Sequence, residues 1–118
     1  MSESLRPHER IRKKSDFVSI YKRGNRYRGR YFNLVYLSND LSYSRMAAVA
    51  SKKVGNAVRR SKAKRWMRTL FRRKKELLND TLDLIMIATS EIHDVSWERL
   101  QEEYLKATRF MNKRSQSV

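Results

Sequence analysis

Apolar residues recur along the chain with two different periods, one typical of helices and one of strands. In the segment DFVSIYKRG, Phe17, Ile20 and Tyr21 are spaced by three and four residues, so they share one face of a helix. Gly24, which follows, is a common helix stop. The pattern therefore predicts a short helix over 16–23.

Four segments have the composition of strands. YFNLVYLS over 31–38 is rich in aromatic and β-branched residues, and RMAAVAS over 45–51 follows it after the turn-like NDLSYS. A short strand near 26–28 precedes both. The run LDLIMIA over 82–88 is apolar at every position except Asp83, which indicates a strand covered on both faces.

Two longer helical patterns complete the order. One begins at Asn56, a good N-cap residue placed after Gly55, and extends to about Leu78. Its apolar positions fall within an arc of roughly 140° on a helical wheel: Ala63, Trp66, Met67, Leu70, Phe71, Leu77 and Leu78. Ser96 can cap a last helix with an apolar face made of Trp97, Leu100, Tyr104, Ala107 and Met111. The order αβββαβα predicts an α+β fold.

The 118 residues fit one domain, and the sequence has no internal repeat or linker. We expect a single domain over 1–118, with flexible basic tails at 1–14 and 112–118. The chain has no apolar run long enough to span a membrane, no signal-peptide pattern and no cysteine. These features predict a cytoplasmic protein.

Charge changes this picture of an ordinary domain. The net charge is +16, and the segment 52–75 carries twelve Lys and Arg residues without one Asp or Glu. Like charges four residues apart oppose a helix, and exposed helix faces usually mix charge signs. A polyanion relieves such repulsion, so nucleic acid is the favoured partner. An anionic membrane surface or a calmodulin-like groove is the alternative, and it requires an exposed apolar stripe.

Residues for catalysis by the protein itself are not evident. His8 and His93 are expected in a tail and a loop, and no cysteine is present to complete a zinc site. Asp80 and Asp83 are expected in a turn and at a strand edge rather than in a carboxylate cluster that holds catalytic metals. We therefore predict no catalytic residue, no metal held by side chains and no small-molecule substrate.

The segment KKVGNAVRRSKAKRWMR resembles the signature of the bacterial ribonuclease P protein family, K-K-x-G-N-A-V-x-R-N-R-x-K-R-x-x-R. Two positions depart from it, since Ser61 stands in place of Asn and Lys62 in place of Arg. Lys62 keeps the charge but loses bidentate geometry toward phosphate. The matching residues are Lys52, Lys53, Gly55, Asn56, Ala57, Val58, Arg60, Lys64, Arg65 and Arg68.

The resemblance implies a subunit of ribonuclease P that assists a catalytic RNA in removing the 5′ leader from precursor tRNA. It implies that the RNA, with its bound Mg²⁺, carries out the chemistry. It also implies an unusual left-handed βαβ crossover, against the general preference for the right-handed form. The residues implied to bind the ribonuclease P RNA are Lys52, Lys53, Asn56, Arg59, Arg60, Ser61, Lys62, Lys64, Arg65, Arg68 and Arg72.

The resemblance further implies a cleft between the first helix and the sheet that holds the single-stranded leader. Phe17 and Tyr21 would line it from the helix, and Phe32 and Val35 from the sheet. Aromatic stacking on unpaired bases tolerates sequence variation, as leaders require. The alternative for Phe17 and Tyr21 is ordinary core packing. The alternative function is a ribosomal or other structural RNA-binding protein with no role in cleavage.

Overall fold

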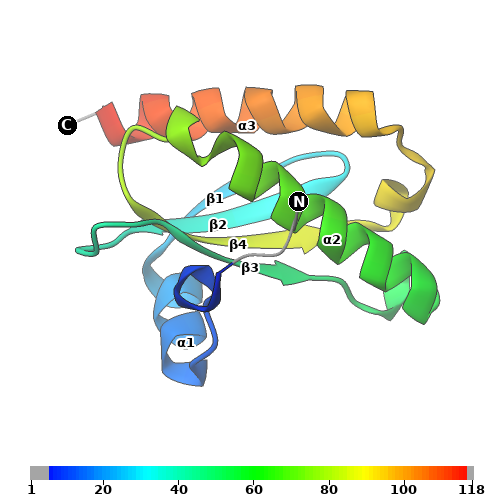
Figure 1. Cartoon of the computed structure of the whole chain (residues 1–118), viewed down its shortest axis with the longest axis horizontal. Helices are drawn as coiled ribbons and strands as arrows, with labels where there is room; N and C mark the ends of the chain where they lie inside the picture. Colours follow the sequence, from blue (N-terminus) through cyan, green and yellow to red (C-terminus); the bar gives the residue numbers. More distant parts are fainter. Residues whose placement is uncertain (1–5, 117–118) are drawn as a thin grey trace.

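The predicted order of elements is confirmed in the computed structural model, which describes residues 6–116, with side chains to Lys113 (Figure 1). The helices are α1 (Lys14–Arg23), α2 (Ala57–Lys74) and α3 (Trp97–Gln116). The strands are β1 (Asn25–Arg28), β2 (Phe32–Ser38), β3 (Arg45–Val49) and β4 (Leu82–Ala88). Short 3-10 helices lie at Pro7–Glu9, Lys52–Val54, Lys75–Leu77 and Ser90–Asp94. No helix among the described residues is long and apolar enough to cross a membrane.

The sheet has four strands in the order β1-β2-β4-β3. β1 pairs with β2 and β2 with β4 in antiparallel fashion, whereas β3 and β4 are parallel. The apolar run of the sequence forms β4, which is a central strand with both faces covered over most of its length. The predicted α+β fold is therefore confirmed, and its sheet is mostly antiparallel.

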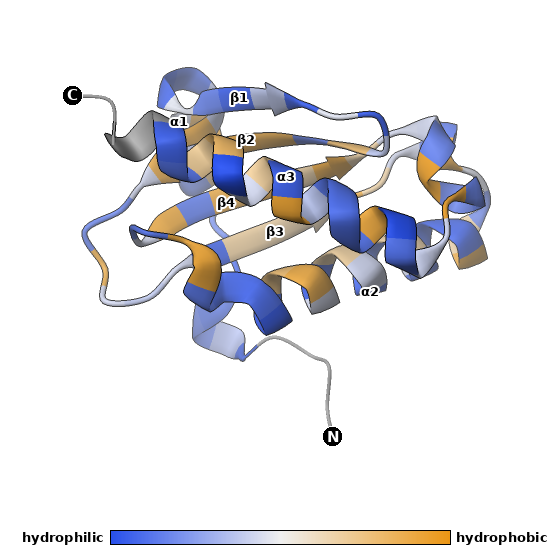
Figure 2. Cartoon of the chain, turned by 90° about the horizontal axis from the view of Figure 1, so that it is seen from above, coloured by the Kyte–Doolittle hydropathy of each residue, from blue (hydrophilic) through white to orange (hydrophobic). Residues whose placement is uncertain are grey.

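The connection between the parallel strands β3 and β4 passes through α2. Figure 2 views the sheet from the side of α2 and α3, and there both strands run to the right. α2 returns to the left on the viewer's side, and β4 lies above β3 in the picture. This path makes the crossover left-handed, as the resemblance implied and against the general rule.

Apolar side chains form one core on each face of the sheet. On the first face, the underside of α2 and the apolar stripe of α3 pack against β2 and β4, with Leu70, Leu84 and Tyr104 completely buried. On the second face, Ile20 of α1 packs against Val35 and Ile85. α1 covers one end of this second face, and no helix lies over it near the arrowheads of β3 and β4 (Figure 1).

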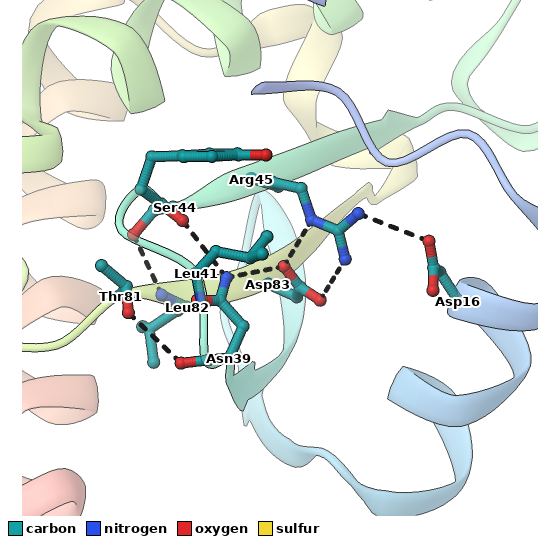
Figure 3. A network of polar contacts seen from close by, with 9 residues as sticks. Asp16, Asn39, Leu41, Ser44, Arg45, Thr81, Leu82 and Asp83 are labelled. Carbon is teal, nitrogen blue, oxygen red and sulfur yellow. Dashed lines mark hydrogen bonds and ion pairs between the residues drawn. The ribbon is translucent and has the colours of Figure 1, made fainter. Parts of the chain in front are cut away.

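A polar network fixes the start of β3 against β4 and α1 (Figure 3). Asp83 of β4 is buried, and it accepts hydrogen bonds from Arg45 Nε and Nη2 at 2.9 and 2.6 Å. Arg45 Nη1 also reaches Asp16 of α1 at 3.4 Å, and Asn39 Nδ2 donates to Asp83 at 2.8 Å. Removing Arg45 would leave the buried charge of Asp83 uncompensated. Because Arg45 also contacts Asp16, the network ties α1 to the start of β3.

Part of the predicted N-terminal tail packs on the domain. The Ile11 N–H donates to the Met46 carbonyl at 3.0 Å, and the Ile11 side chain is buried. Glu9 is also buried, where it forms an ion pair with Lys75. The prediction of a flexible tail over 1–14 is therefore wrong from residue 6 onward, because Ile11 is buried against the domain and Glu9 pairs with Lys75. Residues 1–5 lie outside the described residues.

Two helix ends also differ from the prediction. α2 was expected to reach Leu78, but it ends at Lys74 and continues as the 3-10 helix Lys75–Leu77. α3 runs to Gln116, through the start of the expected tail at 112–118, because no Gly or Pro interrupts it. The Asn112 side chain bonds the Asn79 N–H and the Leu77 carbonyl at 2.9 and 2.7 Å, which ties α3 to the end of α2. Residues 117–118 lie outside the described part.

Candidate nucleic-acid interface

The start of α2 is built by two residues that the sequence singled out. Gly55 has a backbone φ of 138°, which residues with a side chain rarely adopt, and a Cβ at this position would lie 2.7 Å from Arg59 Cδ. The Asn56 side chain accepts a hydrogen bond from the Arg59 N–H at 3.0 Å, so it is the N-cap. Lys52 and Lys53 are exposed in the 3-10 helix immediately before this turn.

The apolar stripe of α2 faces the sheet. Ala63, Met67, Leu70 and Phe71 are buried, as predicted. Trp66 and Leu78 are half-buried, and Leu77, which lies in the following 3-10 helix, is 40% exposed. A membrane surface or a calmodulin-like groove would need this stripe to be accessible, so the structure contradicts that alternative for α2.

The remaining sides of α2 carry the cations. We call the eleven predicted RNA-binding residues the cationic surface, and the structure brings them together along α2 and the turn before it. Exposed members are Lys52, Lys53, Asn56, Arg59, Ser61, Lys62 and Arg65. Half-buried members are Arg60, Lys64, Arg68 and Arg72, which follow one another at a spacing of four residues.

Acidic partners from the same chain are scarce on this surface. Among the side chains described, eight of its cations form no ion pair with a carboxylate: Lys52, Lys53, Arg59, Arg60, Lys62, Lys64, Arg65 and Arg68. Lys75, just beyond α2, is paired with Glu9. The cationic surface is therefore left largely uncompensated, which suits contact with an anionic partner.

Arg68 extends the cationic surface around the edge of the sheet. Burial lowers the pKa of Arg68, and the nearby positive charge of Arg10 lowers it further. The two guanidinium groups therefore repel each other across the outer side of β3. A phosphate placed between them would relieve this repulsion and accept hydrogen bonds from both.

A hollow of about 220 Å³ lies where α1, β3 and α2 meet. Phe17 of α1 lines it, and so do Ala47 and Ala48 of the edge strand β3, whose small side chains lie on opposite faces of the sheet. The other lining residues are Arg10, Ile11, Arg12, Met46 and Arg68. The hollow thus combines one aromatic ring with three arginines, a combination suited to a single-stranded polynucleotide.

The structure separates the four residues predicted to line the leader cleft. Phe17 and Tyr21 are half-buried on α1, and Phe17 lines the hollow. Val35 lies on the same face of the sheet, but only 1% of it is exposed beneath α1. Phe32 packs on the opposite face against Tyr104, so its assignment to the cleft is wrong. Strand residues three positions apart point to opposite faces, which is the physical reason.

Arg10 and Arg12 are lining residues that the sequence reasoning missed. They were assigned to a flexible tail, whereas the segment around them pairs with β3 through Arg10 and Met46. The basic run HERIRKK was a usable signal, because it contains one isolated apolar residue, Ile11, suited to burial.

No group of three metal-ligating side chains is found within residues 6–113. The small α+β domain, with its cationic surface and the adjoining aromatic hollow, defines a class of protein whose surface complements a polyanion.

Comparison with known proteins identifies the family. The model of the family Ribonuclease P matches residues 5–112, so the chain belongs to the ribonuclease P protein family. It is 37% identical over 94 residues to the ribonuclease P protein component of Thermotoga maritima, covering 80% of each chain. Membership associates the chain with ribonuclease P, a ribonucleoprotein of tRNA processing.

Solved structures agree with this assignment. The ribonuclease P protein of Thermotoga maritima superimposes with a TM-score of 0.77 at 32% identity, covering 86% of this chain and 96% of that one. The Staphylococcus aureus ribonuclease P protein gives a TM-score of 0.78 at 32% identity, covering 86% and 94%. The fold expected from the resemblance is therefore confirmed.

Proposed function

We propose that this chain is the RNA-binding subunit of ribonuclease P and assists the catalytic RNA in removing the 5′ leader from precursor tRNA. The observation that supports this best is the largely uncompensated cationic surface of α2 beside the hollow lined by Phe17. We place the protein in the cytoplasm, where it would meet both RNAs.

The cationic surface would bind the ribonuclease P RNA through its phosphates. Burial of the apolar underside of α2 fixes the helix on the sheet, so its cations are presented on a rigid support. If six to ten Lys or Arg side chains reach phosphates, affinity falls by about 10³–10⁵-fold between 50 and 200 mM salt, by analogy with duplex DNA. Lys62, in place of the family arginine, would act as a point charge.

The hollow would hold the leader. A base would stack on the Phe17 ring, and the phosphates on either side would meet Arg10, Arg12 and Arg68. The small side chains of Ala47 and Ala48 let the chain of nucleotides approach the edge strand closely. Since none of these contacts reads a base edge, leaders of different sequence would be accepted.

The reaction itself would remain with the RNA subunit, whose bound Mg²⁺ supplies the charge stabilisation that phosphodiester hydrolysis needs. The protein would contribute by binding: its cations reduce the repulsion between two polyanions and keep the leader in place. No side chain of this chain is assigned to the chemical step.

Reconstitution tests this proposal. Adding the purified chain to a bacterial ribonuclease P RNA at low Mg²⁺ should restore cleavage of precursor tRNA at the 5′ end of the mature sequence. No stimulation would contradict the proposal, and specific 5′ cleavage by the protein alone would contradict the assigned division of labour. A structural RNA-binding protein would instead bind precursor and mature tRNA equally well.

A further inference from the structure

The two tryptophans of the chain lie against each other, although 31 positions separate Trp66 in α2 from Trp97 at the start of α3. Their ring centroids are 5.3 Å apart and the ring planes meet at 71°. Both side chains are only half-buried and lie at the margin of the core between α2, α3 and the sheet. Part of each indole is therefore open to the solvent.

A second hollow, of about 280 Å³, opens at this tryptophan pair. Arg65, Thr69 and Arg73 of α2 complete its lining, and no carboxylate is among the lining residues. Arg68, which lines the Phe17 hollow, does not line this one. The two hollows thus lie on different sides of α2, and cations adjoin both.

A cation already occupies one face of this aromatic pair. Lys62 Nζ lies 4.6 Å from the centroid of the Trp66 ring, one helical turn earlier on α2. Lys62 itself is exposed, so this face of the indole is accessible from the solvent side. A nucleobase can take the place of the ammonium group over the indole, and the displaced lysine is then free to meet a phosphate.

We propose that this hollow, the tryptophan site, binds an unpaired nucleotide of the ribonuclease P RNA. The base stacks on an indole of the Trp66–Trp97 pair, and the neighbouring phosphate lies beside Arg65 and Lys62. The inference rests on the proposed function, because Lys62 and Arg65 belong to the cationic surface. That continuity favours the RNA bound by α2 over the precursor tRNA as the source of the nucleotide.

Charge, rather than aromatic character alone, selects this pair. Tyr27 and Phe110 form another surface pair, with ring centroids 5.1 Å apart and Phe110 43% exposed. Burial raises the pKa of Tyr27, and the negative charge of Glu103 raises it further, so a carboxylate stands beside that pair. A phosphate would be repelled there, which makes Phe110 a matched control.

Fluorescence gives a direct measurement, because the chain contains no tryptophan outside the site. Titration of the full-length protein with a bacterial ribonuclease P RNA should quench the indole emission and reduce its accessibility to acrylamide. A fully paired RNA duplex of the same length should bind through charge and leave the emission unchanged. Unchanged emission with the ribonuclease P RNA, or a change only with precursor tRNA, would overturn the proposal.

Variants separate stacking from packing. W66L should weaken binding of the ribonuclease P RNA by about 5- to 150-fold, W66F should retain most of the affinity, and Phe110→Leu should match the native chain. Equal losses in W66L and W66F, or none in W66L, would overturn the proposal. Thermal unfolding of each variant identifies any loss caused by misfolding, and Trp97→Leu, which should also weaken binding, then provides the second variant.

The proposed function can fail separately from this inference. If replacing the cations of α2 weakens RNA binding but W66L does not, only the tryptophan site is refuted. If neither change weakens RNA binding, the assignment of α2 to the RNA is refuted as well.

Discussion

Phe17 is the residue through which the hollow would meet an unpaired base. Its ring lies on α1 beside Arg10, Arg12 and Arg68, and it is half-buried, so one part packs and another part stays accessible. Phe32 carries the same side chain but is completely enclosed against Tyr104. The difference in exposure therefore indicates that Phe17 is available to a ligand, whereas Phe32 contributes to the core.

Phe17→Ala should weaken binding of precursor tRNA to the holoenzyme by about 5- to 150-fold, the range for one lost stack. Binding of mature tRNA, which has no leader, should stay within about twofold of the native value when measured by the same filter assay. Phe32→Ala should instead lower the free energy of unfolding by about 3–5 kcal/mol, because it empties a core position. Equal losses for both tRNAs in Phe17→Ala would assign Phe17 to the core.

The buried ion pair of Glu9 with Lys75 should make the stability of the protein fall at acidic pH. Burial raises the pKa of Glu9, but the hydrogen bond and charge of Lys75 outweigh it and leave the pKa below the ordinary 4.5. A carboxyl whose pKa is lowered by folding stabilises the protein above its unfolded pKa and loses that contribution as the pH falls through the folded pKa. Glu9→Gln should lower stability at pH 7 and reduce the dependence of stability on pH below about 4.5.

Urea unfolding between pH 3 and 7 measures how the free energy of unfolding of Glu9→Gln and of the native chain depends on pH. Glu76→Gln, which changes an exposed side chain near the same end of α2, is the control and should keep the native pH profile. A profile for Glu9→Gln that matches the native one would show that the pair with Lys75 contributes nothing.

At the scale of elements, α2 must form although its own charges oppose it. Four cations follow one another at a spacing of four residues, and each such like-charge contact costs a few tenths of a kcal/mol. The buried stripe and the Asn56 cap offset this cost. The helix is therefore held by its ends and its underside, while its charge remains available to a partner.

Asn56→Ala should lower the free energy of unfolding by about 0.5–2 kcal/mol, because the Arg59 N–H loses its acceptor. Ser61→Ala, at an exposed position within the same helix, should change it by less than about 0.5 kcal/mol. Urea denaturation of the two variants at one pH compares them. Similar values for both would mean that the cap does not support α2.

The sequence predicted the elements well wherever the pattern was local. The period of three to four residues located α1, α2 and α3, and the apolar run located β4 to the residue. Contacts between distant segments were not predictable in this way: Ile11 pairs with β3 across 35 positions, and Asn112 joins α3 to the end of α2. Such contacts depend on tertiary packing, which no local pattern encodes.

For the candidate site, the basic motif located the cationic surface, but the cleft was predicted only in part. Phe17 lines the hollow, whereas the assignment of Phe32 together with Val35 ignored the alternation of side chains along a strand. That error was avoidable from the sequence alone. The pairing of Trp66 with Trp97 was not, because it depends on how α3 crosses α2.

For the whole molecule, the net charge is +16, and twelve of the 28 Lys and Arg residues lie in the segment 52–75. The left-handed crossover places α2 on one face beside the edge strand β3, and α1 packs on the other face against β2 and β4, with Phe17 reaching the hollow at β3. The cationic surface and the Phe17 hollow therefore adjoin through Arg68. This arrangement would let one small domain contact a folded RNA and a single strand together.

The salt dependence of binding to a bacterial ribonuclease P RNA tests the central claim that the cationic surface of α2 binds RNA phosphates. In one variant, alanine replaces four cations of this surface: Arg60, Lys64, Arg65 and Arg68. This variant should bind more weakly, and its slope of log affinity against log salt should be reduced by roughly 3. A control variant has the same net charge but replaces four exposed cations elsewhere: Arg28, Arg99, Lys106 and Arg109. It should keep nearly the native slope. Equal slopes for the two variants, or unchanged affinity in the first, would contradict the account.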